Sequence, residues 1–468
     1  MMYSNWLPEI VKRSEAGPYI KESDFDMNIT KRIPELINKY GLVYDPNMLV
    51  PSDDDLANRL YQAGMDLFLE MGVYNMSTQR KILFSRDEVE EAVALVPRSF
   101  IVGAGKDAVT MQHRGVESDI PCVIHSGPTG TPCSEKYHPF ILESCAQEPL
   151  VDCLGSGSVS TYQGEMIIPG SPLEILAVQR DAAVAREALR KAGRPEMHIN
   201  DIASPLTCAG KISTYNPEWG MRSTDGLLVS QMVELKSDYD QLSRVARMKT
   251  LGMHVVDLMT PLVGGLGGGP VGTVIVTIAC HLLGVMLYQA SYHIFGHMHL
   301  LHSTDTDRMG LWGYAAGGQA LALNTPIQSI NAIYTQAGLG TEEVLWEIAA
   351  ASIACTVSGL HQGGVGATGG SKEDHTSGLE NRFNAQVSHS AIGLSREDAN
   401  GFVLEFLSHY EESHKNPPSG KSFRDIYNVD TLEPTEEWLE KYNLVSDAII
   451  KSGLDVHNRW KEVKQKAA

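Results

Sequence analysis

Four histidines lie within ten residues of one another: His293, His297, His299 and His302. Residues two apart share a face of a β-strand, so His297 and His299 could bind one metal ion, with Asp305 or Asp307 following. No cysteine or glutamate completes the set nearby, and no His-Glu-x-x-His motif is present. The sequence therefore favours histidines that are hydrogen-bonded or face a substrate, and we expect no metal site.

A second group of polar residues lies on two predicted strands and consists of His198, Asn200 and His254. Alternate residues of a strand point the same way, so these side chains meet if both strands face the interior of one barrel. His299 would join them near the barrel mouth. Neither a Gly-x-Ser-x-Gly motif nor a cysteine in a nucleophile context accompanies them. These residues alone predict a pocket with histidines and no evident nucleophile.

Two glycine-rich stretches match Gly-x-Gly-x-x-Gly, at residues 267–272 and 364–369. The first precedes a helical pattern, but no acidic residue follows it until Asp305, too far to bind a ribose. The second follows a helical pattern instead of a strand. We interpret both as loops that need positive φ or close backbone packing, without a bound dinucleotide.

The elements that must position these residues repeat one theme, a short apolar run followed by a helical pattern. The predicted strands are Ser99–Ala104, Pro121–Ser126, Leu150–Gly155, Glu196–Asn200, Leu227–Met232, Met253–Leu258, Met298–His302 and Ile327–Ile333. Strands that alternate with helices indicate a parallel sheet, and about eight such units over this length favour a closed (β/α)8 barrel. We therefore expect an α/β fold, a TIM barrel with additional N- and C-terminal helices. Its expected parts are an N-terminal helical region packed on the barrel (1–95), the barrel (96–400) and a C-terminal helical extension (401–468).

Composition excludes several classes of protein. The 468 residues carry a formal charge of −19 and no long basic run, which disfavours nucleic-acid binding. The uncharged run 271–290 is long enough to span a bilayer, but it contains His281 and lacks flanking basic anchors, so we predict a buried helix and no membrane contact. Seven widely spaced cysteines and an amino terminus without an export signal indicate a cytoplasmic protein with reduced thiols.

Residues 258–371 contain six charged side chains, where the chain average of 20% would give about 23. Such elements expose little surface and must be covered by other elements or by another subunit. We therefore expect a homo-oligomer.

Several longer strings resemble one enzyme family. They are GPTGTPCSE (127–135), GRPEMHIN (193–200), VSQMVELKSDYD (229–240), MHLLHSTDTDR (298–308), DHTSGLENRF (374–383) and PSGKSFRDIYNVDTLEPTEEW (418–438). In order and register, from about residue 25 to 455, they resemble the monomethylamine:corrinoid methyltransferases of methylotrophic archaea.

This resemblance implies a (β/α)8 barrel, a homo-oligomer that is a hexamer in the archaeal enzyme, and transfer of a methyl group from an amine to Co(I). The corrinoid (cobalamin) belongs to a separate partner protein that docks over the barrel mouth, so no cofactor is expected to be bound permanently. The archaeal enzyme uses pyrrolysine, whose imine adds the amine. In this register the pyrrolysine position is Asn200.

Other site positions of the family also differ. Its two glutamates fall at Leu228 and Leu258, and a glutamine falls at about Ala332, beside Asn331. This chain keeps the family's residue at His299 and in the string around it that contains Ser303, Thr304 and Arg308. Coordinated replacement of acids by leucine indicates a site remodelled for another substrate, because decay would leave unpaired buried carboxylates.

The sequence thus predicts a pyrrolysine-independent methyltransferase whose donor is a small N-methylated compound with a quaternary or delocalised nitrogen. The expected catalytic residues are Asn200 and His299. The expected substrate-binding residues are His198, Leu228, His254, Leu258, Asn331 and Trp312, with Tyr288 and Tyr292 as further candidates for an aromatic wall. Two alternatives remain: a metal-assisted barrel hydrolase that uses the histidines, and an inactive paralogue that only binds a corrinoid protein.

Overall fold

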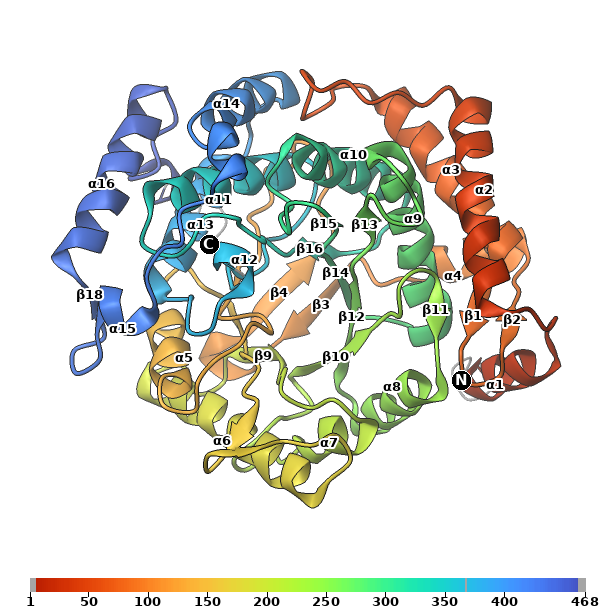
Figure 1. The fold of residues 1–468 in the computed structure, drawn as a ribbon, viewed down its shortest axis with the longest axis horizontal. Helices are drawn as coiled ribbons and strands as arrows, with labels where there is room; N and C mark the ends of the chain where they lie inside the picture. Colours follow the sequence, from red (N-terminus) through yellow and green to blue (C-terminus); the bar gives the residue numbers. More distant parts are fainter. Residues whose placement is uncertain (1–5, 367, 462–468) are drawn as a thin grey trace.

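The structure is a computed structural model that describes residues 6–366 and 368–461. A ring of short parallel strands forms its centre (Figure 1). One arc contains β5 (His125–Ser126), β6 (Cys153–Gly155) and β9 (His198–Asp201). The other contains β10 (Gly226–Ser230), β12 (His254–Met259), β14 (Tyr292–Phe295) and β16 (Ser329–Asn331).

Residues 361–362 close the ring. Gln362 bridges in parallel to Ile124, and His361 bridges in parallel to Ile330. On the other side β9 lies against β10, where the Leu228 amide donates to Asp201 Oδ1 at 3.0 Å. The closed barrel that the sequence predicts is confirmed.

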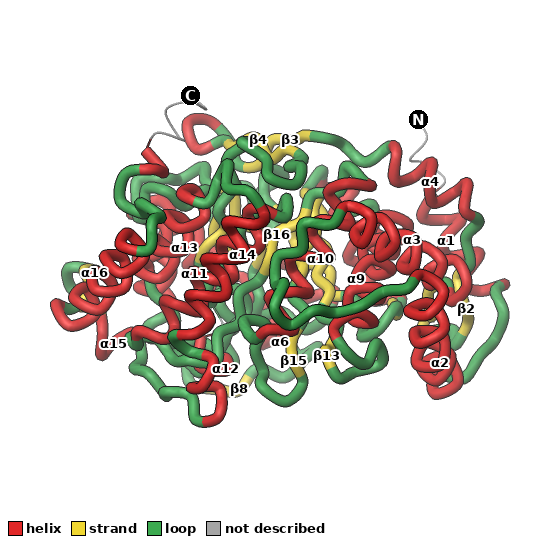
Figure 2. The backbone as a smooth tube through the Cα atoms, turned by 90° about the horizontal axis from the view of Figure 1, so that it is seen from above, coloured by secondary structure: helices red, strands yellow, loops and turns green. Residues whose placement is uncertain are grey.

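Two predicted barrel strands lie elsewhere. Ser99–Ala104 instead contributes β3 (Ser99–Val102), which pairs antiparallel with β4 (Val109–Gln112) in a hairpin at the amino ends of the barrel strands. The other is the predicted strand Met298–His302. Only Met298–His299 forms a strand, β15, which pairs with β13 (Leu262–Val263) outside the barrel. Figure 2 shows the β3–β4 hairpin and the β13–β15 pair at opposite ends of the barrel. Their places in the ring are taken by β14 and residues 361–362.

Helices surround the barrel. They are α5 (His138–Ala146), α6 (Pro172–Lys191), α7 (Cys208–Ser213), α8 (Tyr239–Leu251), α9 (Pro270–Leu283) with its π-helical continuation η3 (Gly284–Tyr288), α10 (Arg308–Asn324), α11 (Glu342–Val357) and α13 (Gly378–Ser390). The short elements of the loops are η2 (Gly105–Asp107), β7 (Thr161–Tyr162), β8 (Glu165–Met166), β11 (Lys236–Ser237) and α12 (Thr368–Ser371).

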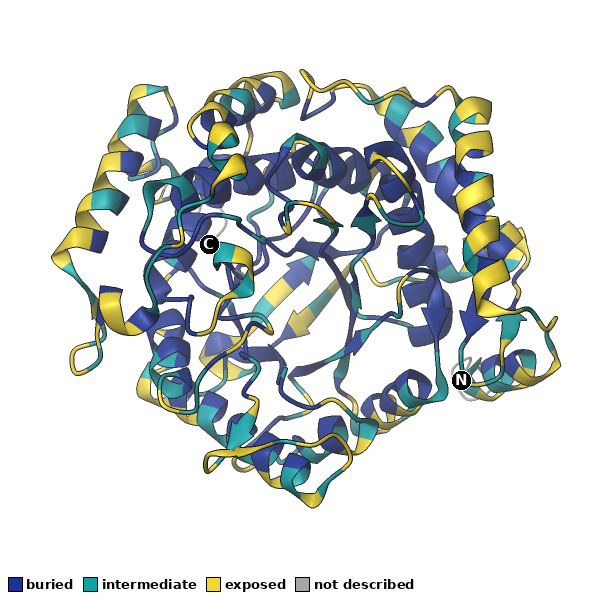
Figure 3. Cartoon of the chain, in the orientation of Figure 1, coloured by how far each residue is buried: buried dark blue, intermediate teal, exposed yellow. Residues whose placement is uncertain are grey.

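Elements from both ends of the chain form an outer layer. From the amino-terminal part come α1 (Trp6–Ala16), α2 (Glu22–Tyr40), α3 (Asp54–Met71), β1 (Val73–Asn75), β2 (Arg80–Ile82) and α4 (Arg86–Ala94). From the carboxyl-terminal part come α14 (Arg396–Ser408), η4 (Glu411–Lys415), α15 (Phe423–Ile426), β17 (Tyr427–Asn428), β18 (Glu433–Pro434) and α16 (Glu436–Lys451). Figure 3 shows that α2 and α16 expose their outer faces while the helices beneath them are buried.

This outer layer explains the charge-poor half of the chain. Within one chain, α2 and α3 pack on α9, while α13, α14 and α16 pack on α11. One helical stretch, Pro270–Tyr288, is long and apolar enough to cross a membrane, but all of it is buried inside the protein. The predicted buried helix is confirmed, and the low charge of residues 258–371 needs no second subunit to cover it.

The two glycine-rich motifs are places where backbone segments pack closely, as expected. A Cβ on Gly272 would lie 1.9 Å from the Gly267 carbonyl oxygen, and one on Gly366 would lie 2.0 Å from that of Pro128. All seven cysteines are free thiols, and only Cys208 is not fully buried.

Candidate active site

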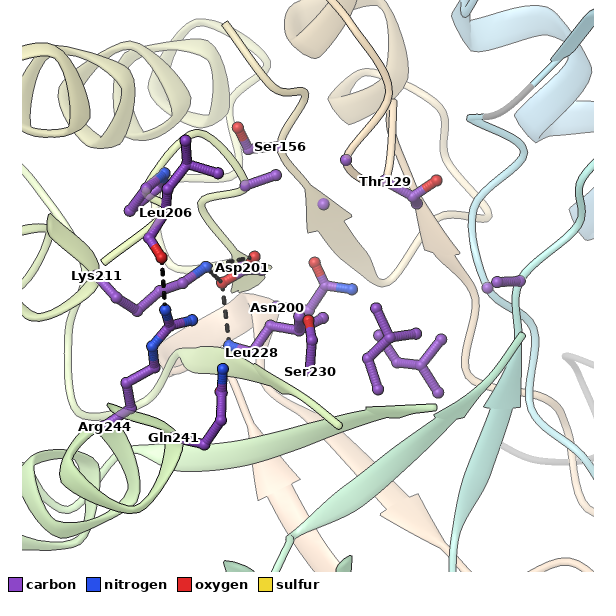
Figure 4. Close-up of a pocket in the computed structure, with 18 of the residues that line it drawn as sticks. Thr129, Ser156, Asn200, Asp201, Leu206, Lys211, Leu228, Ser230, Gln241 and Arg244 are labelled. Atoms are coloured by element: carbon purple, nitrogen blue, oxygen red, sulfur yellow. Dashed lines mark hydrogen bonds and ion pairs between the residues drawn. The ribbon is translucent and has the colours of Figure 1, made fainter. Parts of the chain in front are cut away.

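A cavity of about 610 Å³ lies at the carboxyl ends of the barrel strands (Figure 4). In TIM barrels this end carries the chemistry, because the loops that follow the strands converge there. The residues that line it from strands, and directly after β16, are Gly155, Asn200, Asp201, Leu228, Ser230, Leu258, Ile294, Ile330, Asn331 and Ala332. Loops add Thr129, Ser156, Tyr334 and Gly364, among others.

One wall of the cavity is apolar because three neighbouring strands are in register. Leu258 pairs with Ile294, and Ile294 pairs with Ile330. Register partners on adjacent strands point to the same side of a sheet, so these three side chains form one row that faces the cavity. Leu228 and Ala332 extend this wall. The wall suits apolar ligand surface and offers N–H donors no side-chain acceptor.

Asn200 supplies a polar group beside this wall. Its side chain on β9 is 4% exposed, and Nδ2 donates to His125 Nδ1 at 3.3 Å. Burial holds the pKa of His125 well below its ordinary value, so the ring is neutral and Nδ1 can accept. Asn200 Oδ1 has no hydrogen-bond partner within the described part of the chain. A buried acceptor without a partner is costly, and a bound ligand could satisfy it.

Asn331 is the second amide in the cavity, but its polar atoms are already engaged. Its Nδ2 donates to Gln362 Oε1 at 3.0 Å, and its Oδ1 accepts from the Gly363 amide at 2.6 Å. Asn331 therefore fastens β16 to the segment that closes the barrel.

Most charged groups at the cavity form ion pairs with each other. Lys211 on α7 is 3% exposed, and its Nζ lies 2.9 Å from both oxygens of Asp201. Burial lowers the Lys211 pKa, and the Asp201 carboxylate opposes that shift. Arg244 Nε donates to Asp240 Oδ2 at 2.9 Å on α8. Figure 4 shows Lys211 and Arg244 on the same side of the cavity as Asp201.

Two predicted pocket residues lie deeper in the barrel than the cavity. His198 and His254 point inward like Asn200 and Leu258, as expected, but they sit two and four residues earlier on their strands. At about 3.3 Å per residue this places them roughly 7 and 13 Å below those cavity residues. His198 Nε2 contacts the Tyr292 hydroxyl at 3.0 Å, and the prediction that both histidines line the pocket is wrong.

Three other candidates lie outside the cavity. Trp312 on α10 is buried against Tyr44, with ring centroids 5.4 Å apart. Tyr288 donates to Ser237 Oγ in the helical layer at 2.8 Å. His299 lies beyond the barrel on β15 and contacts Asp307 Oδ2. The predictions that these three residues line the pocket are wrong, because helices and β15 present them to neighbouring elements.

His297 and His299, the metal-binding pair that the sequence disfavours, do not point to one site. His297 is buried, and its Nε2 lies 2.8 Å from the Gly310 carbonyl oxygen, away from any shared site with His299. A different group, His299, His302 and Asp307, lies close enough together for one metal ion.

Comparison with known proteins agrees with this geometry. The family model described as "Monomethylamine methyltransferase MtmB" matches residues 7–454. Monomethylamine methyltransferase MtmB1 of Methanosarcina barkeri is 33% identical over 433 residues, which cover 92% of this chain and 94% of that protein. MtmB of Methanosarcina mazei is 34% identical over 435 residues with the same coverage. The chain belongs to the monomethylamine methyltransferase MtmB family.

Solved MtmB structures share the whole fold. The crystal structure of Methanosarcina barkeri MtmB superposes with a TM-score of 0.92 at 32% identity, covering 96% of this chain and 98% of that one. A crystal structure of a hydroxylamine complex of MtmB superposes with a TM-score of 0.93 at 32% identity. The MtmB relatives are named as methyltransferases, which makes this chain a member of a family of methyl-transferring enzymes.

The cavity also contains residues that the sequence analysis did not single out. Ile294 and Ile330 complete the apolar row, and Tyr334 lines the cavity next to Ala332. Ile294 would have been found had Tyr292–Phe295 been taken as the barrel strand. No sequence pattern marked Lys211, on the short helix α7, or Tyr334, in a loop, because their places at the cavity follow only from the complete fold.

Proposed function

We propose that this chain transfers a methyl group from a small N-methylated compound to Co(I) of a separate corrinoid protein, without pyrrolysine. The donor nitrogen is quaternary or part of a delocalised ring. The observation that carries the proposal is the chemistry of the cavity, where an asparagine stands beside a wall of leucine and isoleucine.

Support comes from the convergence of four positions. The family resemblance aligns Asn200 with pyrrolysine, Leu228 and Leu258 with two glutamates, and Ala332 approximately with a glutamine. These four residues come from different strands or their ends, and all of them line one cavity. Their convergence supports the alignment, since a shifted register would turn such side chains out of the barrel.

The missing electrophile restricts the donor. In methyl transfer, the Co(I) electron pair forms the new bond to carbon while the C–N electrons leave with nitrogen. An amine that retains its lone pair is a poor leaving group, and an amide such as Asn200 offers no imine carbon that could activate it. A quaternary nitrogen leaves as a neutral amine, and a delocalised one spreads the electron pair, so neither needs an adduct.

The walls of the cavity favour the same donors. Monomethylammonium carries three N–H donors. Asn200 Oδ1 could accept from one of them, but N–H groups that face Leu258, Ile294 and Ile330 would lack partners at a cost in free energy. A quaternary ammonium has only methyl groups to present to that wall. The lining also carries three carboxylates, Asp201, Asp238 and Asp240, against the two cations Lys211 and Arg244, and this balance favours a positively charged donor.

The remaining parts of the proposal rest on the family resemblance. The cytoplasmic protein would act as a homo-oligomer, and its corrinoid partner would dock at the carboxyl face, where the cavity lies. We assign Asn200 to orient the donor. Its unpartnered Oδ1 attracts the positive charge of a quaternary or delocalised nitrogen, and it accepts a hydrogen bond from a donor that also carries an N–H or O–H group. His299 lies outside the cavity and receives no catalytic role in the proposal.

The test is conversion of Co(I) to methyl-Co(III), followed optically with a corrinoid protein from the same organism and a panel of N-methyl donors. Asn200→Ala should lower kcat/KM at least about tenfold, corresponding to roughly 1.4 kcal/mol of barrier. Asn458→Ala, which alters an exposed asparagine in the carboxyl-terminal part of the chain, is the matched control. Equal rates for the two variants would overturn the role of Asn200. Absence of turnover with every donor would favour the inactive paralogue, and hydrolytic turnover that requires a metal would favour the hydrolase.

A further inference from the structure

Three potential metal ligands converge outside the cavity, and a fourth, from a distant segment, lies beside them. His299, His302 and Asp307 place their ligand atoms within 4.8 Å of one another. His414 of η4 stacks next to His302, with ring centroids 6.0 Å apart. We propose that these four side chains bind one divalent transition-metal ion of the zinc class, which fastens the loop after β15 to the carboxyl-terminal part of the chain.

The rings already have the orientation that such a site needs. The rings of His299 and His302 meet edge to face at 4.6 Å. Asp307 Oδ1 accepts from the Gly310 amide at 2.8 Å, which fixes the carboxylate, while its Oδ2 contacts His299 Nδ1. The two contacting atoms, His299 Nδ1 and Asp307 Oδ2, would both bind the ion, which would replace the proton between them.

His414 is oriented by a hydrogen bond to a residue outside the proposed ligand set. Its Nδ1 is held by Gln336 Oε1, and its Nε2 is buried without a hydrogen-bond partner in the portion of the chain that the structure describes. A ring nitrogen fixed by an outer hydrogen bond, with the other nitrogen free, is the usual arrangement of a histidine that binds a metal. An ion pair between His299 and Asp307 alone would need neither His302 nor His414.

The donor set selects the class of metal. Imidazole nitrogens suit zinc, cobalt and nickel, whereas calcium and magnesium prefer sites made entirely of oxygen ligands. Three histidines and one carboxylate provide the four ligands of a closed structural zinc site. The sequence alone predicted no metal here, because His414 is more than one hundred residues from the other three.

The position of the cluster gives the ion a structural role. Thr304 Oγ1 donates to the Tyr334 carbonyl oxygen at 2.6 Å, and the Tyr334 amide donates to Asp305 Oδ1 at 3.0 Å. The loop that would hold the ion therefore also holds Tyr334, which lines the cavity. Because the cluster itself is outside the cavity, metal bound here stabilises the barrel mouth and does not imply hydrolysis.

The experiment uses the full chain without an affinity tag, treated with a chelator and then titrated with zinc in a calorimeter. We expect about one equivalent to bind, and His302→Gln and His414→Gln to weaken binding at least about tenfold each. His457→Gln is the matched control, because His457 lies 3.9 Å from Asp447 in another histidine–aspartate pair that belongs to no group of three potential ligands among the described residues. It should leave the zinc affinity unchanged.

Cobalt provides a second measurement that does not depend on the variants. Co²⁺ bound to the wild-type chain should show the intense visible absorption of a tetrahedral site with nitrogen and oxygen ligands, and zinc should displace it. The proposal is overturned if the wild-type chain binds less than half an equivalent of zinc. It is also overturned if the cobalt spectrum is that of a six-coordinate ion, or if His302→Gln and His414→Gln bind zinc as tightly as His457→Gln.

Discussion

Leu258 on β12 and Ile294 on β14 are register partners, and both side chains line the cavity at the barrel mouth. In this position a polar or acidic side chain would contact the donor, whereas leucine gives it only methyl surface. The pair therefore connects strand register directly to the choice of substrate, because a shift of one residue would turn both side chains away from the cavity.

Leu258→Gln tests this connection. A glutamine adds an amide that needs hydrogen-bond partners in the apolar row, so binding of a quaternary donor should weaken at least about fivefold, or roughly 1 kcal/mol. Binding can be measured by titration calorimetry. Leu439→Gln on α16, where the leucine is 37% exposed, is the control and should bind the donor like the wild type. Equal affinity for all three proteins would show that the row does not contact the donor.

The buried pair of Lys211 and Asp201 should contribute strongly to stability. Lys211→Met leaves the Asp201 carboxylate, which also accepts from the Leu228 amide, without its cation. The free energy of unfolding, measured with urea, should fall by about 3 kcal/mol. Lys12→Met removes an exposed lysine whose Nζ lies 3.9 Å from Glu9, and should change it by less than about 0.5 kcal/mol. A loss below about 1 kcal/mol for Lys211→Met would contradict this role.

Acid should destabilise the barrel interior through its histidines. Burial lowers the pKa of His254 to about 4, whereas an unfolded histidine titrates near 6.5. Between those values the unfolded chain binds more protons, so the free energy of unfolding falls as the pH falls from 6.5 towards 4. From pH 7 to pH 5, the wild type should lose about 1 to 2 kcal/mol more than His254→Phe. Parallel losses in the two proteins would mean that His254 titrates normally in the folded state.

Much of the fold could be predicted from the sequence because apolar runs followed by polar or glycine residues mark most barrel strands. The segment 361–362, which closes the barrel, was not predicted as a strand because its polar and glycine residues are typical of a loop. The strand β14 was not predicted because the neighbouring segment Met298–His302 is equally apolar. Only tertiary packing decides which of these two segments joins the barrel.

The sequence predicted which side chains point into the barrel, but not how far along the barrel axis each one lies. Alternation along strands places His198 with Asn200, and His254 with Leu258, on inward faces. Periodicity does not say which layer of the barrel a residue occupies, and this difference separates the cavity residues from the buried histidines. Tyr334 and His414 belong to segments whose positions follow only from the complete fold.

The central claim is that the donor nitrogen is already activated before it reaches this protein. Its most direct test is the ratio of two rates of methyl-Co(III) formation, with tetramethylammonium and with monomethylamine, at equal concentrations of donor and corrinoid protein. N-methylpyridinium is the matched delocalised donor. We predict that at least one of the activated donors reacts at least about tenfold faster than monomethylamine, a difference of roughly 1.4 kcal/mol in barrier. A rate with monomethylamine that equals or exceeds both would contradict the account.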